Sequence, residues 1–164
     1  MRRALGIASA VFIATSATAQ DAPFDPVLPE TCLAAGKAAA CIGLGAELCM
    51  AGEAGSSNVG IGGCFAAELR WWDDELNRVY AAMIDLYGTR DAELRDLGSA
   101  APPSVPALRA AQRAWIGWRD GYCAFEATTW GGGSGSGIAE TQCRMQLTGE
   151  QALRLDARLA ESGG

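Results

Sequence analysis

The chain of 164 residues contains no histidine, and this absence excludes several classes of enzyme. Ser-His-Asp and Cys-His mechanisms need a histidine, which is also the commonest general base. The chain also lacks any Cys-x-x-Cys pair, so a zinc site would need cysteines alone at spacings that zinc motifs do not use. We therefore expect no metal and no other cofactor.

Apolar runs are short, and the one at the N-terminus predicts export. Met1-Arg2-Arg3 precedes an apolar run from Ala4 to Ala14, which is followed by an Ala-x-Ala site ending at Ala19. This order is typical of a secretory signal peptide, and the run is shorter than the ~20 residues that span a bilayer. We expect cleavage near Ala19, a periplasmic or extracellular protein and no stable membrane insertion. The residue directly after the site is Gln20 rather than a cysteine, so we expect no lipid anchor.

Basic residues are fewer than acidic ones. The expected cleavage removes Arg2 and Arg3 from 13 basic residues and none of the 19 acidic ones, so the net charge changes from −6 to −8. Such a surface argues against nucleic acid, because phosphate binding needs a basic patch. It suits a basic protein partner, although a net charge also simply keeps an exported protein soluble.

Six cysteines follow the expected cleavage site, and in an exported chain an even count predicts three disulfides. Sequence alone allows fifteen arrangements. Cys123 ends one expected helix and Cys143 begins the next, so this pair would close the loop between them. Cys49 and Cys64 flank a Gly/Ser-rich turn. These two pairs leave Cys32 with Cys41.

No segment alternates between apolar and polar residues at period two, and the apolar positions instead follow helical spacing. The clearest helix places its apolar residues at steps of three and four: Ile61, Phe65, Leu69, Trp72, Leu76, Val79, Tyr80, Met83 and Tyr87. We expect Gly88 to end it and residues 90–97 to form a short helix. A helix capped by Ser104 and a last helix over residues 141–160 follow.

The expected fold is all-α, a small disulfide-stabilised bundle of about four main helices with antiparallel neighbours. Residues 1–19 are the signal peptide, 20–29 an extended leader and 30–164 a single domain. Its first helical region, residues 30–50, is broken near Gly43 and Gly45. In the helix that begins near Ser104, we expect the inner face to contain Val105, Leu108, Ala111, Trp115 and Tyr122 or Phe125.

Two helical stripes contain polar residues that would cost free energy in a core unless they find partners. The first contains Asp73, Asn77 and Tyr80, and the second contains Gln112, Trp115 and Arg119. Asp73 pairs with Arg119, Asn77 with Trp115, and Tyr80 with Gln112. The residue numbers in each pair have the same sum, as they do for facing residues of antiparallel helices. We therefore predict a structural brace of these six residues, with an Asp73–Arg119 salt bridge and a Tyr80–Gln112 hydrogen bond.

Carboxylates and tryptophans give the alternative of an enzyme that acts on peptidoglycan. Asp73, Asp74 and Glu75 are consecutive, and Glu68 precedes Trp72 by one turn. Paired carboxylates can perform glycosidase chemistry. However, an arginine partner would keep Asp73 ionised, whereas a general acid must be protonated. We therefore expect no enzyme. Three tryptophans outside the stripes are candidates for the surface: Trp71, Trp118 and Trp130.

In order along the chain, Cys64, Trp72-Asp73-x-x-Leu76-Asn77-x-x-Tyr80, Gln112-Arg113-x-Trp115-x-x-x-Arg119-Asp120-x-x-Cys123, Cys143 and Leu155 form a specific pattern. This pattern resembles the LprI-type lysozyme inhibitor family, in its N-terminal-domain form, over about residues 49–159. The resemblance implies an exported, disulfide-stabilised helical domain, some of whose relatives bind and inhibit lysozyme.

The leading hypothesis is therefore a periplasmic protein that inhibits a basic lysozyme through non-covalent contact. The alternative is a cell-envelope structural or adaptor module with no lysozyme target. The Gly-rich loop of residues 130–137, with Ser134 and Ser136 beside Trp130, is the first candidate for partner binding. Residues 52–60 are the second candidate loop, and Trp118 and Trp71 are further candidates.

Overall fold

The computed structural model describes residues 24–36 and 38–163, and the expected signal peptide lies outside them. The described chain is helical throughout and contains no strand. Its elements are α1 (Val27–Ala34), the 3-10 helix η1 (Ala38–Cys41), α2 (Leu44–Ala51), the 3-10 helix η2 (Glu53–Ser56), α3 (Asn58–Asp96), α4 (Ser104–Thr128) and α5 (Ser136–Gly163). None of the described helices has the length and hydropathy of a membrane span.

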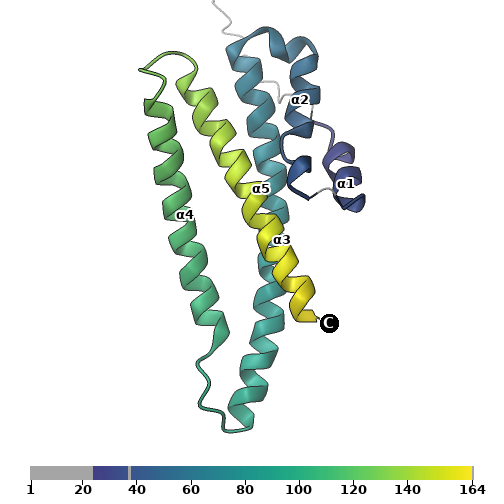
Figure 1. Ribbon diagram of the computed structural model, residues 1–164, viewed down its shortest axis with the longest axis vertical. Helices are drawn as coiled ribbons and strands as arrows, with labels where there is room; N and C mark the ends of the chain where they lie inside the picture. Colours follow the sequence, from purple (N-terminus) through teal and green to yellow (C-terminus); the bar gives the residue numbers. More distant parts are fainter. Residues whose placement is uncertain (1–23, 37, 164) are drawn as a thin grey trace, which may run out of the picture.

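In Figure 1, α3 runs down, α4 runs up and α5 runs down, and α5 lies between α3 and α4. Hydrogen bonds between α3 and the segment that includes α5 join residues a nearly constant 72 to 76 positions apart, so these helices are parallel. Contacts between α4 and α5 join residues 39, 29 and 20 positions apart. Because this separation shrinks toward the loop that connects them, the two helices are antiparallel.

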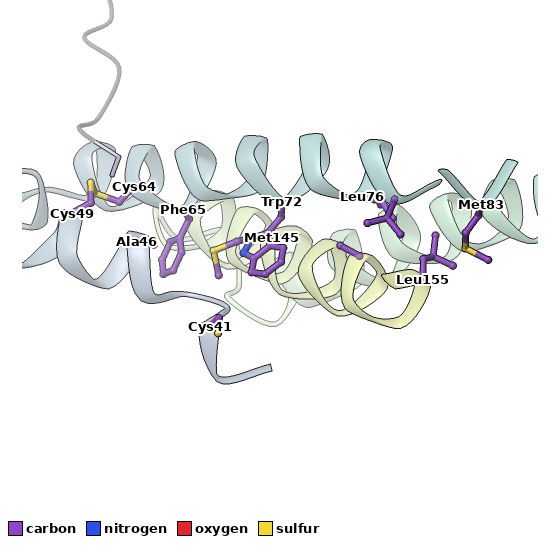
Figure 2. Close-up of a cluster of buried hydrophobic side chains, with 12 residues drawn as sticks. Cys41, Ala46, Cys49, Cys64, Phe65, Trp72, Leu76, Met83, Met145 and Leu155 are labelled. Atoms are coloured by element: carbon purple, nitrogen blue, oxygen red, sulfur yellow. A yellow bond between two sulfur atoms is a disulfide. The ribbon is translucent and has the colours of Figure 1, made fainter. Parts of the chain in front are cut away.

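The core lies between α3 and α5 and is covered on one side by α2 and η1. Figure 2 shows Phe65, Trp72 and Leu76 of α3 near Met145 and Leu155 of α5. This burial follows the three-and-four spacing predicted from the sequence, because one face of a regular helix turns toward its neighbour. Together with Val79 and Met83, the apolar stripe of α3 is buried as expected.

Gly149 lets α5 approach the largest core side chain. A Cβ atom at this position would lie 2.9 Å from the Ile42 side chain and 3.1 Å from the Trp72 ring. Both distances are shorter than an ordinary van der Waals contact, so a larger residue would push α5 away from α3. Trp72 itself is 1% exposed, which shows how closely the helices pack around it.

The structure forms the three predicted disulfides, Cys32–Cys41, Cys49–Cys64 and Cys123–Cys143. The first joins α1 to η1, the second joins α2 to α3, and the third joins α4 to α5. The second bridge thus links α2 covalently to the bundle, while the first ties α1 to the neighbouring η1.

The predicted end of the long helix at Gly88 is wrong, because α3 continues to Asp96. A glycine in a helix interior costs only ~1 kcal/mol relative to alanine, and neighbouring contacts outweigh it here. Beyond this end lies Gly98, whose positive φ of 69° suits a residue just past a helix. There the Gly98 N–H donates to the Arg95 carbonyl, and the Ser99 N–H donates to the Leu94 carbonyl.

Two other boundaries also differ from the prediction. Residues 27–29, expected in an extended leader, form the first turn of α1, because Pro29 is tolerated in a first turn. The last helix begins at Ser136 rather than near residue 141. The Gly-rich sequence therefore made the start of this helix hard to predict. The loop between α4 and α5 is correspondingly shorter than expected.

Candidate partner-binding site

The predicted brace between α3 and α4 is wrong in its pairing. On α3, Trp72 and Leu76 are buried, whereas Asp73 and Asn77 are exposed and face each other, with the Asn77 amide 3.4 Å from an Asp73 carboxylate oxygen. Tyr80 is partly buried and packs against the core. The polar members of the first stripe therefore lie at the surface and need no buried partner.

The polar residues of α4 bind α5 instead. The Arg119 guanidinium donates to the Asp120 carboxylate at 2.9 Å and to the Thr148 hydroxyl at 3.1 Å. It also lies 5.1 Å from the centre of the Trp115 ring. Arg119 therefore makes no salt bridge with Asp73 in the described chain. The constant sum of residue numbers fits any antiparallel pair and did not reveal that these α4 side chains turn toward α5.

The second predicted contact is also replaced by one to α5. The Gln112 side-chain oxygen accepts a hydrogen bond from the Gln151 amide at 3.2 Å, in place of one from Tyr80. Asp120 lies 3.7 Å from the Arg144 guanidinium of α5. With the Cys123–Cys143 disulfide, these contacts attach α4 to α5 through polar and covalent links rather than through a wide apolar seam.

The inner face of α4 agrees with the prediction only in part. Leu108 and Trp115 pack against the core as expected. Ala111, Tyr122 and Phe125 are exposed, and Cys123 is the only fully buried side chain among the described residues of this helix. The apolar spacing placed Leu108 and Trp115 correctly but extended the inner face too far, to residues that lie on the solvent side of α4. An apolar stripe thereby remains on the outside of the molecule.

Glu68 is a structural residue whose role the sequence did not reveal. Its carboxylate is fully buried and accepts N–H bonds from Gly43 and Ala46, both at 2.6 Å, and from the Trp72 indole at 2.9 Å. It therefore caps the N-terminus of α2 from a position on α3, where the helix dipole favours a negative charge. The available signal was its position, four residues before Trp72 and on the same face of the helix.

The two loops predicted for partner binding lie at the same end of the bundle (Figure 1). The Asn58 amide at the start of α3 donates to the Ser134 hydroxyl in the α4–α5 loop at 2.9 Å. Behind these loops, the Cys49–Cys64 and Cys123–Cys143 disulfides tie the helices from which the loops emerge. We call this region the loop end, defined as residues 47–69 and 120–143.

Trp130 is the most prominent side chain of the α4–α5 loop. It is 57% exposed, although part of its ring packs on the loop backbone. A Cβ atom at Gly135 would lie 2.5 Å from a ring carbon of Trp130. The glycine therefore provides the space in which the ring rests, and the loop presents a large aromatic surface from a defined position.

The remaining candidate residues fall in different places. Ser136 begins α5, and its N–H donates to the Gly133 carbonyl at 3.0 Å. Trp118 is 54% exposed on α4 and stacks on Tyr122. Trp71 is only partly exposed, because it packs against the core and lies edge-on to Trp72. Of the three candidate tryptophans, Trp71 thus has the least surface to offer a partner.

The loop end contains acidic residues and no lysine or arginine. Each of its two segments is more than twenty residues long, and neither contains a lysine or an arginine. Its acidic residues are Glu47, Glu53, Glu68, Asp120, Glu126 and Glu140. Glu47 and Glu53 are exposed, so they project a negative field from this end of the molecule.

The carboxylates of α3 do not form a recognisable catalytic pair. Glu75 accepts two hydrogen bonds from the Arg78 guanidinium, at 2.9 and 2.8 Å, while Asp73 and Asp74 lie exposed on the helix. In the part of the chain that the structure describes, no three histidine, cysteine or acidic side chains gather as metal ligands would.

Comparisons with known proteins give one family model and two uncharacterised relatives. The family described as Lysozyme inhibitor LprI matches residues 49–155. An uncharacterised protein of Rhizobium meliloti (strain 1021) is 35% identical over 92 residues, which cover 56% of this chain and 66% of that protein, just under two thirds. An uncharacterised 17.7 kDa protein from the puhA 5′ region of Rhodobacter capsulatus is 29% identical over 119 residues, which cover 72% of this chain and 74% of that protein. No solved structure matches.

Proposed function

The chain belongs to the family of lysozyme inhibitor LprI, and we propose on this premise that it is an exported protein that binds and inhibits a basic lysozyme. Inhibition would occur by non-covalent contact that blocks access of the enzyme to the cell wall. The loop end is the surface that we propose to make this contact.

The observation that carries the proposal is the distribution of charge. Across the two segments of the loop end, acidic residues occur without a single lysine or arginine. Glu68 is buried, and Asp120 and Glu140 pair with Arg119 and Arg144 at the border of this region, so the exposed negative charge of the loop end comes chiefly from Glu47 and Glu53. A surface of one sign accelerates encounter with a cationic partner and disfavours acidic ones. A basic lysozyme has the complementary charge.

The geometry of the α4–α5 loop supports the same surface. Trp130 projects from a short loop that is closed by the Cys123–Cys143 disulfide and joined to α3 through the Asn58–Ser134 hydrogen bond. A loop held in this way loses little conformational entropy on binding. An exposed tryptophan is also the side-chain type that most often contributes a large share of binding energy in an interface.

The disulfides support the proposed location. Three bridges and no free cysteine among the described residues are typical of proteins that function in an oxidising compartment. With the expected signal peptide, they favour the periplasm or the extracellular space, where a lysozyme would be encountered.

The direct test is a cell-wall lysis assay with the purified exported protein. We expect lysis by a c-type or a g-type lysozyme to fall at about tenfold molar excess, which saturates a complex of micromolar Kd or tighter at micromolar enzyme. An unrelated acidic protein of similar net charge is the control, because charge alone can sequester a basic enzyme. Unchanged lysis with both enzyme types would contradict the proposal.

A failed lysis assay would leave the cell-envelope adaptor as the alternative. That alternative predicts that the immobilised protein retains an envelope protein and no lysozyme. Hydrolysis of the cell wall by the chain alone would contradict both the inhibitor and the adaptor, because each assigns it a binding role only.

A further inference from the structure

Three aromatic side chains form an exposed row on the outer face of α4. Trp118, Tyr122 and Phe125 are 54%, 43% and 59% exposed. The rings of Trp118 and Tyr122 stack with centroids 5.5 Å apart, and those of Tyr122 and Phe125 lie 6.4 Å apart. Spacings of four and three residues put all three on one side of the helix. No described element of the chain covers this row.

The same face continues toward the N-terminus of α4 with small side chains. Ala107, Ala111 and Ala114 precede Trp118 at steps of four, three and four residues, and all three are exposed. The face therefore has one half made of alanines and one half made of large aromatic rings. None of these six residues, which we call the α4 outer face, is charged.

We propose that the α4 outer face binds a second copy of this chain, with the two α4 helices antiparallel across a two-fold axis at Trp118. Facing residues of antiparallel helices have a constant sum of numbers. Placing Trp118 opposite its counterpart puts Ala114 opposite Tyr122 and Ala111 opposite Phe125. Tyr122 and Phe125 then each meet an alanine, the pattern that lets facing helix surfaces interdigitate, while the two Trp118 rings meet each other at the axis. The patch is complementary to itself, as a two-fold interface requires.

Charge and area are consistent with this occupant. Two copies of an acidic chain repel each other over most of their surfaces, but the α4 outer face has no charge, so the copies can meet there without facing carboxylates. An aromatic side chain buries 150–250 Å², and about half of each is exposed here, so six rings offer roughly 600 Å². With the alanines, the interface approaches the ~1,000 Å² of a weak specific dimer.

Sedimentation equilibrium of the purified exported protein tests the proposal without any lysozyme. We expect a monomer–dimer equilibrium with a Kd on the order of 10 µM. Ala114→Glu should shift the protein to monomer, because it places two carboxylates in the apolar interface. Ala124→Glu is the matched control, since it makes the same change on an exposed side of α4 outside this face and should leave the dimer intact. Circular dichroism should show that both variants remain helical.

A double variant tests the antiparallel register. Ala114→Glu combined with Tyr122→Arg puts opposite charges across both facing pairs, so it should recover dimer that Ala114→Glu alone loses. A wild-type protein that stays monomeric up to about 500 µM, well above the expected Kd, would overturn the proposal. A dimer that survives Ala114→Glu would also overturn it. If the wild type is monomeric and Ala114→Glu instead weakens lysozyme inhibition, the face belongs to the lysozyme contact.

Discussion

At both ends of the bundle, a carboxylate of α3 caps the N-terminus of another helix, but the two ends differ in their disulfides and charges. At the loop end, Glu68 of α3 caps α2 through two backbone N–H groups. At the opposite end, Asp91 of α3 caps α4 by accepting N–H bonds from Ser104 and Val105, at 2.8 and 2.9 Å. In each case one long helix supplies a carboxylate to the N-terminus of another.

Of the two ends, only the loop end adds disulfides, and its two segments contain no lysine or arginine. The opposite end, defined as residues 85–109 and 154–163, contains no cysteine and carries both arginines and acidic residues. It is fastened by weaker means, such as the Tyr87–Ser162 hydrogen bond of 2.9 Å. Because the bundle packs without disulfides at one end, the disulfides and uniform charge at the other end are better explained by a function that needs a fixed, acidic surface.

The largest expected difference between the ends concerns the two caps. Glu68→Ala should lower the free energy of unfolding by about 3 kcal/mol or more, because three buried donors lose their acceptor at about 1–3 kcal/mol each. Asp91→Ala should cost clearly less, because water can reach the N–H groups that it leaves. Urea unfolding followed by circular dichroism measures both variants, and equal losses would show that burial does not distinguish the two ends.

Removing the Cys123–Cys143 disulfide should have the next largest effect. The double variant Cys123→Ser/Cys143→Ser should lose about 3 kcal/mol of stability, the value for closing a loop of this size. It should also weaken lysozyme inhibition, because the α4–α5 loop is no longer fixed. Cys32→Ser/Cys41→Ser is the control, since that pair lies outside the loop end. If both double variants inhibit lysozyme equally well, a fixed loop is not required.

Two tryptophans of similar exposure can show whether lysozyme binds the α4–α5 loop or α4. Trp130→Ala should weaken lysozyme inhibition by about 10-fold or more, the effect of losing an interface anchor, with little change in melting temperature. Trp118→Ala removes the same side chain from α4 and should leave the inhibition constant within a few-fold. The opposite result would place the lysozyme contact on α4.

The smallest predicted effect is a pH dependence at the opposite end. The N–H bonds from Val105 and Ser104 lower the pKa of Asp91 below its usual value of 3.8. A carboxyl group with a lowered pKa stabilises the fold above that usual value, and this contribution is lost as the pH falls through the folded pKa. The urea midpoint of the wild type should therefore exceed that of Asp91→Ala at pH 7, and the difference should shrink below about pH 4. A difference that is constant with pH would contradict the capping role.

Much of the fold could be predicted because it depends on local periodicity. The buried stripe containing Trp72, Leu76 and Val79 follows helical spacing, and the disulfides join cysteines that flank predicted turns. Composition alone does not show whether α3 ends near Gly88 or near Gly98. What decided it was the conformation of Gly98, which only the folded chain reveals.

The arrangement of the helices was not predictable in the same way. The Asp73–Arg119 pairing followed from an antiparallel relation between α3 and α4, but spacing contains no information on whether a third helix lies between them. The role of Glu68 was also hidden, because its partners lie 22 and 25 positions away. The candidate loops could be recognised by composition, yet their meeting through Asn58 and Ser134, 76 positions apart, depends on the parallel packing of α3 and α5.

The most direct test of the central claim compares lysozyme binding by charge variants at the two ends. Glu47→Gln/Glu53→Gln neutralises two exposed carboxylates at the loop end, and Glu93→Gln/Glu161→Gln neutralises two at the opposite end. Both double variants have the same net charge, so a difference in the association rate constant reports position alone. We predict that the loop-end variant associates several-fold more slowly at low salt while the opposite-end variant stays near wild type. Equal rates for the two variants, or a larger loss at the opposite end, would contradict the assignment of the loop end as the lysozyme-binding surface.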